Sequence, residues 1–239
     1  MKILYLFMIF KEILLTFSLT NINVDTTGLL IPYSIGALGY IKKNLKICDY
    51  HLTGISGGSF ASVIYHLEDD LTNHNKIWDK LIGDDNYVLK FNKNLDEFQQ
   101  IIKYNMMNKY TDVNINNIPI SIVVSRINNL KIINEKINKF ENFEELIDYC
   151  ICSSYIPYIC GKTFSKKYKN NNYIDGVIFK NKHHFDCIGN CDNSIYIHRS
   201  MGHRKFNLDD YLYLDKNKSL QLFNYGWNDC QEIYNKKMI

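Results

Sequence analysis

One serine of the chain has neighbours that suit it to nucleophilic chemistry. Ser56 lies in the stretch Gly54-Ile55-Ser56-Gly57-Gly58, which has the pattern G-x-S-x-G. A serine at a sharp strand-to-helix turn presents its hydroxyl but strains its backbone, so the residues around it must be very small. Gly54, Gly57 and Gly58 meet that requirement. We therefore predict a nucleophile elbow at these three glycines, with Ser56 as the catalytic nucleophile.

A serine hydroxyl needs a base, because it is a weak nucleophile until its proton is removed. Asp175 is the candidate, in the stretch Asn172-Tyr173-Ile174-Asp175-Gly176-Val177. An acid that directly follows an apolar pair can enter a site at the end of a strand. Asp-Gly is also a common turn dipeptide, so this motif alone leaves a simple turn at Asp175 and Gly176 as the alternative.

The segments around Ser56 predict the elements that position it. Residues 45–53 alternate enough to form a short strand, and residues 59–66 favour the first turns of a helix. Residues 13–19 predict a buried first strand, and residues 32–43 predict a helix that ends in a basic turn. This order of strand, helix, strand, elbow and helix is typical of an α/β protein with a mostly parallel sheet. Further elements are predicted at residues 118–125 (strand), 143–150 (helix with acidic first turns) and 194–198 (strand).

The polar, Asn-rich stretch between Glu68 and Asn117 has helical parts. We interpret it as a lid or flank of the domain and not as part of its core.

Composition predicts a single domain over residues 1–239. The chain has 46% hydrophobic residues and no long linker, which suits one sizeable core. A formal net charge of +3, dispersed along the sequence, gives no sign of a nucleic-acid partner. Residues 1–12 contain an apolar run interrupted by Lys11 and Glu12, too short for a membrane span. We interpret them as an N-terminal extension with three possible explanations: an extra strand, a peripheral membrane contact or a poorly chosen start.

The seven cysteines favour a reducing, intracellular compartment, because their number is odd and none forms a C-x-x-C pair. The best metal candidate is Cys187 and Cys191 with nearby His183 and His184. Inert thiols are the simpler interpretation, and we predict neither a metal nor a cofactor.

Four segments together resemble the patatin-like phospholipase family, in the same order along the chain. In that family a G-x-S-x-G motif carries the nucleophile, and Asp-Gly carries the other catalytic side chain. The resemblance runs from about residue 13 to residue 177. The segments are Gly28-Leu29-Leu30-Ile31-Pro32-Tyr33-Ser34-Ile35-Gly36, Gly54-Ile55-Ser56-Gly57-Gly58, Ser153-Ser154-Tyr155-Ile156-Pro157-Tyr158 and Tyr173-Ile174-Asp175-Gly176.

The resemblance implies a three-layer α/β/α fold with a mostly parallel central sheet and a Ser56–Asp175 dyad. It also implies a lipid acyl hydrolase acting on phospholipids or glycerides, with a peripheral membrane or lipid-droplet surface as a further partner. Oxyanion donors in the family come from a loop of pattern D-G-G-G-x-[RK]-G, which places them here at Thr27 and Gly28. The chain departs from the pattern in this loop, because Asp25-Thr26-Thr27-Gly28 keeps only one of its glycines. Val177 is a milder departure, since Gly or Ala usually follows Asp-Gly.

Two alternatives stay open. In the first alternative, the chain is a catalytically weak homologue that binds lipid or a partner, because Thr26 and Thr27 resist positive φ angles. The other alternative is an ordinary α/β-hydrolase in which His198 or His203 is the base of a Ser-Asp-His triad.

Overall fold

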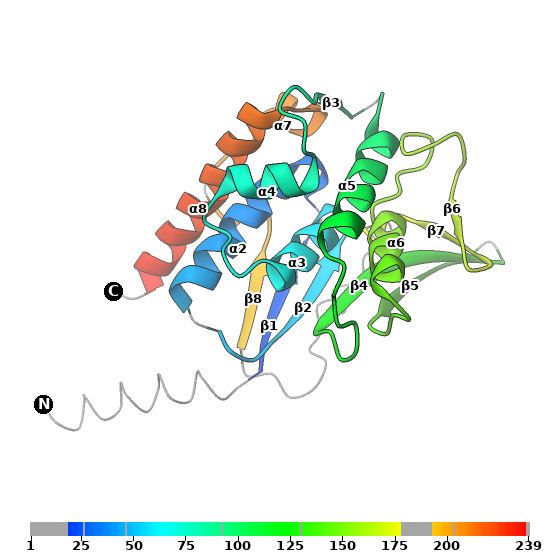
Figure 1. The fold of residues 1–239 in the computed structure, drawn as a ribbon, viewed down its shortest axis with the longest axis horizontal. Coiled ribbons are helices and arrows are strands. Elements are labelled where there is room, and N and C mark those ends of the chain that lie inside the picture. Colours follow the sequence, from blue (N-terminus) through cyan, green and yellow to red (C-terminus); the bar gives the residue numbers. More distant parts are fainter. Residues whose placement is uncertain are drawn as a thin grey trace, which may run out of the picture.

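The computed structural model describes residues 19–237, apart from positions 26, 46, 92, 130, 178–192 and 203. Within these ranges the chain is a mixed α/β protein with a largely parallel central sheet (Figure 1). The strands are β1 (Thr20–Val24), β2 (Tyr50–Ile55), β3 (Leu89–Lys90), β4 (Ile120–Asn128), β5 (Lys131–Ile137), β6 (Lys166–Tyr168), β7 (Asn171–Ile174), β8 (Asn193–Ile197) and β9 (Tyr213–Leu214). The helices are η1 (Gly28–Leu30), α2 (Ile31–Leu45), α3 (Gly57–Leu67), α4 (His74–Leu81), α5 (Leu95–Lys109), α6 (Phe143–Ser153), α7 (Asp209–Leu212) and α8 (Lys216–Lys237).

The central sheet has seven strands, with β6-β7-β4-β2-β1-β8 as the main order and β5 paired to β4. Strands β8, β1, β2 and β4 are parallel, whereas β5, β7 and β6 join antiparallel. The chain moves in one direction from β1 to β2 to β4. Right-handed crossovers therefore place the intervening helices α2 and α3 on the same face of the sheet.

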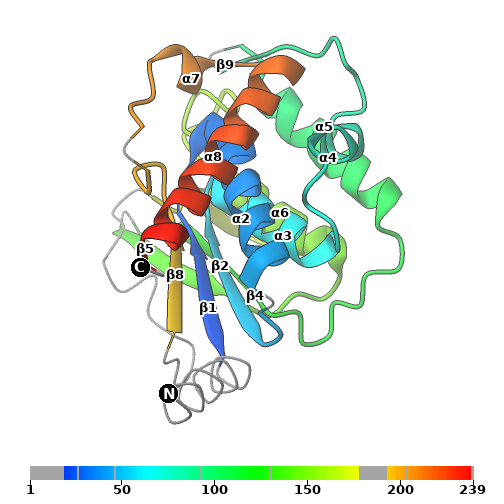
Figure 2. The ribbon, with the colours of Figure 1, turned by 90° about the vertical axis from the view of Figure 1, so that its left-hand side faces the viewer.

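Helix α3 packs against both α2 and α6, all three helices contact strands of the sheet, and α8 lies alongside α2 (Figure 2). The two helices α2 and α8 approach backbone to backbone. A Cβ atom on Gly36 would lie 2.0 Å from the Phe223 carbonyl oxygen, and one on Gly226 would lie 1.8 Å from that of Tyr33. Only glycine permits this approach. Most buried hydrophobic side chains of the described ranges form one cluster around these helices.

The two faces of the parallel strands differ in character. Gly54 faces α3, since a Cβ there would lie 2.5 Å from the Ser59 Cα. Ile22 and Leu52 share this apolar face by register and alternation. Asn23, Thr53 and Ser121 point to the opposite face and are buried there as well. Helices α2, α3 and α6 contact the central sheet directly, and the three-layer arrangement stays a prediction.

Most predicted elements are confirmed, with ends that shift by a few residues. The predicted helices 32–43, 59–66 and 143–150 are α2, α3 and α6, and the predicted strands 118–125 and 194–198 are β4 and β8. The strand predicted at 45–53 is wrong in its first half, because Leu45 ends α2 and β2 begins only at Tyr50. Positions 13–18 of the predicted first strand, and the extension 1–12, lie outside the described residues. The described first strand begins just after them, at Thr20.

Our interpretation of residues 68–117 as excluded from the core is wrong. Helices α4 and α5 flank the domain, but their inner faces belong to the hydrophobic cluster, where Trp78, Phe98 and Met106 are at most 5% exposed. The many Asn and Lys residues of this stretch lie on the outer faces. Amphipathic helices therefore account for its polar composition.

Candidate active site

Ser56 occupies a strained turn between β2 and α3. Its φ and ψ angles are 52° and −129°, a region that residues with a side chain rarely adopt. The turn brings the start of α3 very close to β1, and Gly58 permits this approach. A Cβ atom on Gly58 would lie 2.4 Å from the Val24 carbonyl oxygen. The sequence thus places the serine at the carboxyl end of the central strand β2, with its amide at the start of a helix.

Asp175 lies beside Ser56, although 119 residues separate them in the sequence. The Ser56 hydroxyl donates a hydrogen bond of 2.7 Å to Oδ2 of Asp175, while Oδ1 accepts one of 2.9 Å from the Val177 amide. Both side chains are 3% exposed. Gly176 allows the close approach, because a Cβ there would lie 2.3 Å from the Val123 carbonyl oxygen. The serine proton therefore already points at a carboxylate oxygen.

Burial raises the pKa of the Asp175 carboxyl to about 6, against the opposing effect of its hydrogen bonds from Val177 and Ser56. Desolvation disfavours the charged form of a carboxyl group, which makes the carboxylate a stronger base. At neutral pH Asp175 is still mostly ionised. It can then accept a proton at the pH where a general base is most effective.

The predicted oxyanion loop lies against the elbow. A Cβ atom on Gly57 would meet the Gly28 carbonyl oxygen at 2.7 Å and the Thr27 Oγ1 at 2.9 Å. Gly28 has the positive φ of 53° that its residue type favours, whereas Thr27 has an ordinary φ of −120°. Thr27 therefore avoids the positive φ angle that a threonine resists. Thr26 lies outside the described residues.

Three polar groups at this contact are available to a ligand. Gly28 and Gly57 are the first residues of η1 and α3, so their amides have no acceptor within their own helix. The buried Thr27 hydroxyl has no hydrogen-bond partner among the described residues. Amides at a helix start favour negative charge. This arrangement can stabilise an oxyanion formed next to Ser56.

The end of helix α6 holds both Ser56 and Asp175, a feature that the sequence analysis missed. The Ser153 hydroxyl accepts from the Ser56 amide at 2.8 Å and donates to the Val123 carbonyl at 2.6 Å. The Ser153 carbonyl accepts from the Gly176 amide at 2.9 Å, and the Tyr155 carbonyl accepts from the Asp175 amide at 2.8 Å. The segment 153–155 therefore fixes the relative position of nucleophile and acid. The Ser-Ser pair of this segment was visible in the sequence, but its contacts were not.

Helix α5 covers the site with apolar side chains and one amide. A small cavity of about 30 Å³ adjoins Ser56, and Leu95, Phe98 and Gln99 of α5 line it. Gln99 is 4% exposed and donates to the carbonyl and hydroxyl oxygens of Ser154. The remaining lining residues include Leu29, Ile31, Phe60, Phe91 and Ile156. The walls of the cavity beside Ser56 are thus largely hydrocarbon.

His198 makes its described contacts away from the Ser56 hydroxyl. Its Nδ1 lies 2.5 Å from the Ser200 hydroxyl, and its Nε2 lies 3.6 Å from the Asp25 carboxylate. Ser56, in contrast, donates to Asp175 without an imidazole between them. His203, the other triad candidate, lies outside the described residues. So do Cys187, Cys191, His183 and His184, which form the metal candidate.

Comparison with protein-family models finds no match for this sequence, and a search of curated proteins finds none either. In the described part of the chain, every helix is too short or too polar to cross a lipid bilayer.

Proposed function

We propose that the protein is a lipid acyl hydrolase that cleaves fatty-acyl esters of phospholipids or glycerides through a Ser56–Asp175 dyad. The observation that carries the proposal is the 2.7 Å hydrogen bond from the Ser56 hydroxyl to Asp175 at a positive-φ elbow. A carboxylate in this position can take the serine proton directly, so the reaction needs no histidine and no cofactor.

The reaction proceeds through an acyl-enzyme. As Asp175 takes the proton, Ser56 Oγ attacks the ester carbonyl, and the resulting oxyanion accepts hydrogen bonds from the amides of Gly28 and Gly57. The carbonyl reforms, the bond to the alcohol breaks, and the alcohol oxygen takes the proton from Asp175. A water molecule then repeats the sequence on the acyl-enzyme, which releases the fatty acid and restores the serine.

The surroundings of the site favour a lipid over a small polar ester. Ile156 lines the cavity beside Ser56, and the same loop carries Tyr158 and Phe164, which are 70% and 51% exposed. Exposed aromatic side chains are favoured at membrane interfaces, where one end is apolar and the other wet. Lys162 lies between them in the sequence and suits an anionic surface. We propose an intracellular protein that contacts a membrane or lipid droplet peripherally through this loop.

We also propose the three-layer, patatin-like version of the observed α/β architecture. Its support is the parallel order β8-β1-β2-β4, with the elbow directly after β2 and the acid directly after β7. In this arrangement a second layer covers the polar face that carries Asn23, Thr53 and Ser121.

The experiment is hydrolysis of a short-chain chromogenic ester by wild type, Ser56→Ala and Asp175→Asn, with Ser62→Ala as a matched buried-serine control. We expect the first two variants to lose essentially all activity, because the members of a dyad act as a unit. The control should remain within a few fold of wild type. Half-normal hydrolysis by folded Ser56→Ala would remove Ser56 as the nucleophile.

A catalytically weak, lipid-binding homologue is the second candidate. The specific observation in its favour is the deep burial of the dyad beside a cavity of only about 30 Å³. A fluorophosphonate probe separates the two candidates, because it reacts with an activated serine without requiring turnover. Labelling of Ser56 combined with negligible ester hydrolysis would favour the weak homologue, as would restored hydrolysis when Thr26 and Thr27 are both replaced by Gly.

A further inference from the structure

An open pocket of about 320 Å³ lies in the segment from the end of β8 to α7, and we call it the arginine pocket. Its described lining residues are two arginines, a serine and two aromatic residues: Arg199, Ser200, Arg204, Phe206 and Tyr211. None of them is acidic. The chain has only three arginines among its 28 basic residues, and two of the three line this pocket. The third, Arg126, is paired with Glu135 on the central sheet.

Helix α8 holds Arg204 in a fixed position beside the loop, as the arrangement in Figure 2 shows. Its Nη2 lies 3.2 Å from Oδ1 of Asp229, and its Cζ lies 3.7 Å from the centroid of the Tyr225 ring. Oδ2 of Asp229 accepts a hydrogen bond of 3.0 Å from the Tyr33 hydroxyl. Asp229 is buried, whereas the Arg204 side chain is 33% exposed. The guanidinium is therefore preorganised, and part of it remains accessible from the pocket.

Arg199 supplies a positive charge that Asp229 does not neutralise. Its Cζ lies 5.6 Å from the centroid of the Tyr211 ring, and it forms no ion pair within the described part of the chain. The buried acid of α7, Asp210, is paired with Lys218. Both buried acids next to the pocket thus have basic partners of their own. The charge of Arg199 stays available to a ligand.

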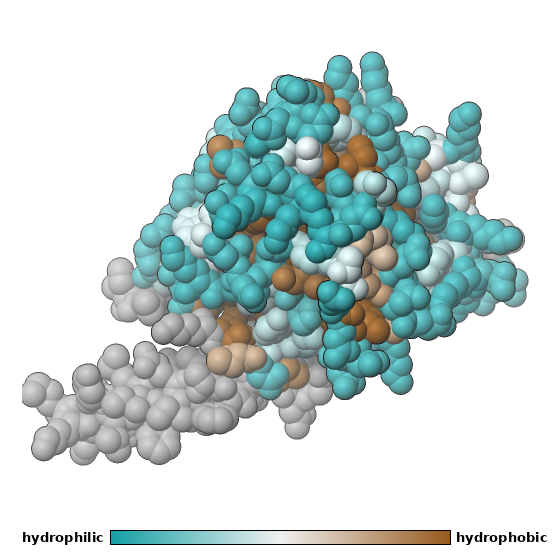
Figure 3. Space-filling view, in the orientation of Figure 1, coloured by the Kyte–Doolittle hydropathy of each residue, from teal (hydrophilic) through white to brown (hydrophobic). Residues whose placement is uncertain are grey.

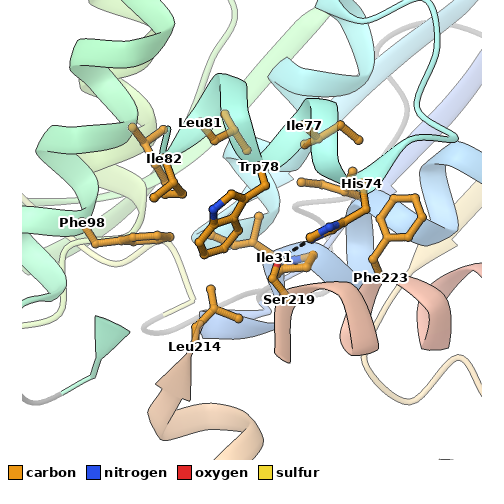
Figure 4. A pocket seen from close by; sticks show the side chains of 13 residues that line it. Ile31, His74, Ile77, Trp78, Leu81, Ile82, Phe98, Leu214, Ser219 and Phe223 are labelled. Atoms are coloured by element: carbon orange, nitrogen blue, oxygen red, sulfur yellow. Dashed lines mark hydrogen bonds between the residues drawn. The ribbon is translucent and has the colours of Figure 1, made fainter. Parts of the chain in front are cut away.

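The cavity beneath α4 has the opposite character. Figure 4 shows Ile77, Trp78 and Leu81 around it, and its volume of about 30 Å³ corresponds to roughly one water molecule. Its two described polar side chains, His74 and Ser219, lie 2.7 Å apart and satisfy each other. In Figure 3 the outer surface over α4 is mostly hydrophilic, so this helix directs its apolar side chains inward. An anion here would be buried without a partner, which is very costly.

The arginine pocket lies at the same edge of the sheet as the candidate active site. Ile197 of β8 pairs with Val24 of β1, which pairs with Gly54 of β2. These parallel strands end at one edge, with β8 about 10 Å from β2. The Phe206 and Tyr33 rings meet edge to face with centroids 5.2 Å apart, and α7 packs against η1. Ligands of open α/β sheets bind outside the carboxyl ends of the strands, which is where this pocket opens.

The lining groups suit a phosphate group. A guanidinium presents five N–H donors in a planar fork that matches phosphate oxygens bidentately, and such charge-assisted hydrogen bonds are strong. Two guanidinium groups together can serve more oxygens than a single carboxylate offers. A volume of about 320 Å³ is in the range of small-molecule pockets, so an organic group attached to the phosphate can lie against Phe206 and Tyr211.

We propose that the arginine pocket binds a phosphate group, with Arg199 and Arg204 donating hydrogen bonds to its oxygens. The inference does not depend on the proposed function, and the pocket lies outside residues 13–177, where the family resemblance runs. A phospholipid headgroup and a free phosphate ester present the same oxygens to the two arginines.

Isothermal titration calorimetry with glycerol 3-phosphate and with inorganic phosphate tests the pocket without turnover. We expect saturable binding by wild type and a dissociation constant at least about tenfold higher for Arg199→Gln. The double variant Arg204→Gln with Asp229→Asn should lose binding as well, and it leaves no buried charge unpaired. Lys131→Gln, which removes an exposed charge from β5, is the matched control and should bind as wild type does.

Arg199 is exposed, so its replacement leaves the fold intact and decides the matter even if the double variant does not fold. Absence of saturable binding by wild type would overturn the proposal. Wild-type affinity in Arg199→Gln, or in a folded double variant, would overturn the two-arginine site.

Hydrolysis of two lipids with the same acyl chains, phosphatidylglycerol and diacylglycerol, identifies the source of the phosphate. For a substrate headgroup, Arg199→Gln should lower kcat/KM about tenfold on phosphatidylglycerol and less than about twofold on diacylglycerol, with Lys131→Gln unchanged on both. For a free phosphate ester, Arg199→Gln should hydrolyse both lipids as wild type does while losing affinity in the calorimeter. Equal losses on both lipids would refute the headgroup assignment. If wild type hydrolyses neither lipid, the proposed function fails, and the calorimetric result still decides the pocket.

Discussion

Replacement of Ser153 by alanine measures how far the elbow depends on helix α6. The Ser153 side chain is fully buried and gives the Ser56 amide its acceptor at 2.8 Å. An unpaired buried amide costs about 1–3 kcal/mol, and loss of the hydroxyl bond to the Val123 carbonyl adds about 0.5–1.5 kcal/mol. We therefore expect Ser153→Ala to lower the free energy of unfolding by about 2–4 kcal/mol.

Urea unfolding followed by circular dichroism gives this free energy directly. The matched control is Ser62→Ala, also fully buried, whose hydroxyl donates at 2.9 Å to the Gly58 carbonyl in its own helix. That carbonyl keeps its intrahelical amide partner, so the control should lose less than about 1 kcal/mol. If the two variants differ by less than about 0.5 kcal/mol, which is within ordinary surface-mutation scatter, Ser153 does not support the elbow.

Three further predictions concern the proposed chemistry. The pKa of Asp175 is about 6, so only about a tenth of the molecules have an ionised Asp175 at pH 5. The value of kcat/KM should therefore fall about tenfold from pH 7 to pH 5. A pH profile that stays flat down to pH 5 would contradict a buried Asp175 base. His198→Ala should hydrolyse a chromogenic ester within a few fold of wild type, whereas a histidine-based triad would lose roughly a thousandfold, which would remove Asp175 as the direct base. Gly28→Val should reduce kcat on the order of a hundredfold, since a β-branched residue resists the φ of 53° and would move an oxyanion donor; unchanged kcat in folded protein would place the oxyanion donors elsewhere.

The local part of the site was predictable from the sequence, because steric rules act between neighbours. A small-residue pattern around Ser56 is enough to predict a strained turn between a strand and a helix, and the structure has one there. The acid was predictable only as a candidate. Its contact with the serine depends on β4 and β7 lying side by side, a pairing that no local pattern specifies.

Long-range contacts explain what the sequence analysis missed. Ser153 reaches the Ser56 amide across 97 residues, and its role follows only from where α6 ends. Helix α8 was not predicted, because many of its residues are polar and its packing relies on glycine contacts with α2. The Asn-rich composition of residues 68–117 hid the apolar faces of α4 and α5. These faces become evident only when residues three and four apart are grouped.

The two helices that meet at the site point opposite ends at the dyad. Helix α3 begins immediately after Ser56 and presents the positive end of its dipole there, while α6 ends at Ser153 and directs its negative end toward Asp175. A positive helix end at Ser56 and a negative helix end near Asp175 favour the same direction of proton transfer. This arrangement lowers the energy of the state in which the proton has moved from the serine oxygen to the carboxylate. In the proposed reaction, the two helix ends therefore favour proton transfer from Ser56 to Asp175 even in the absence of substrate.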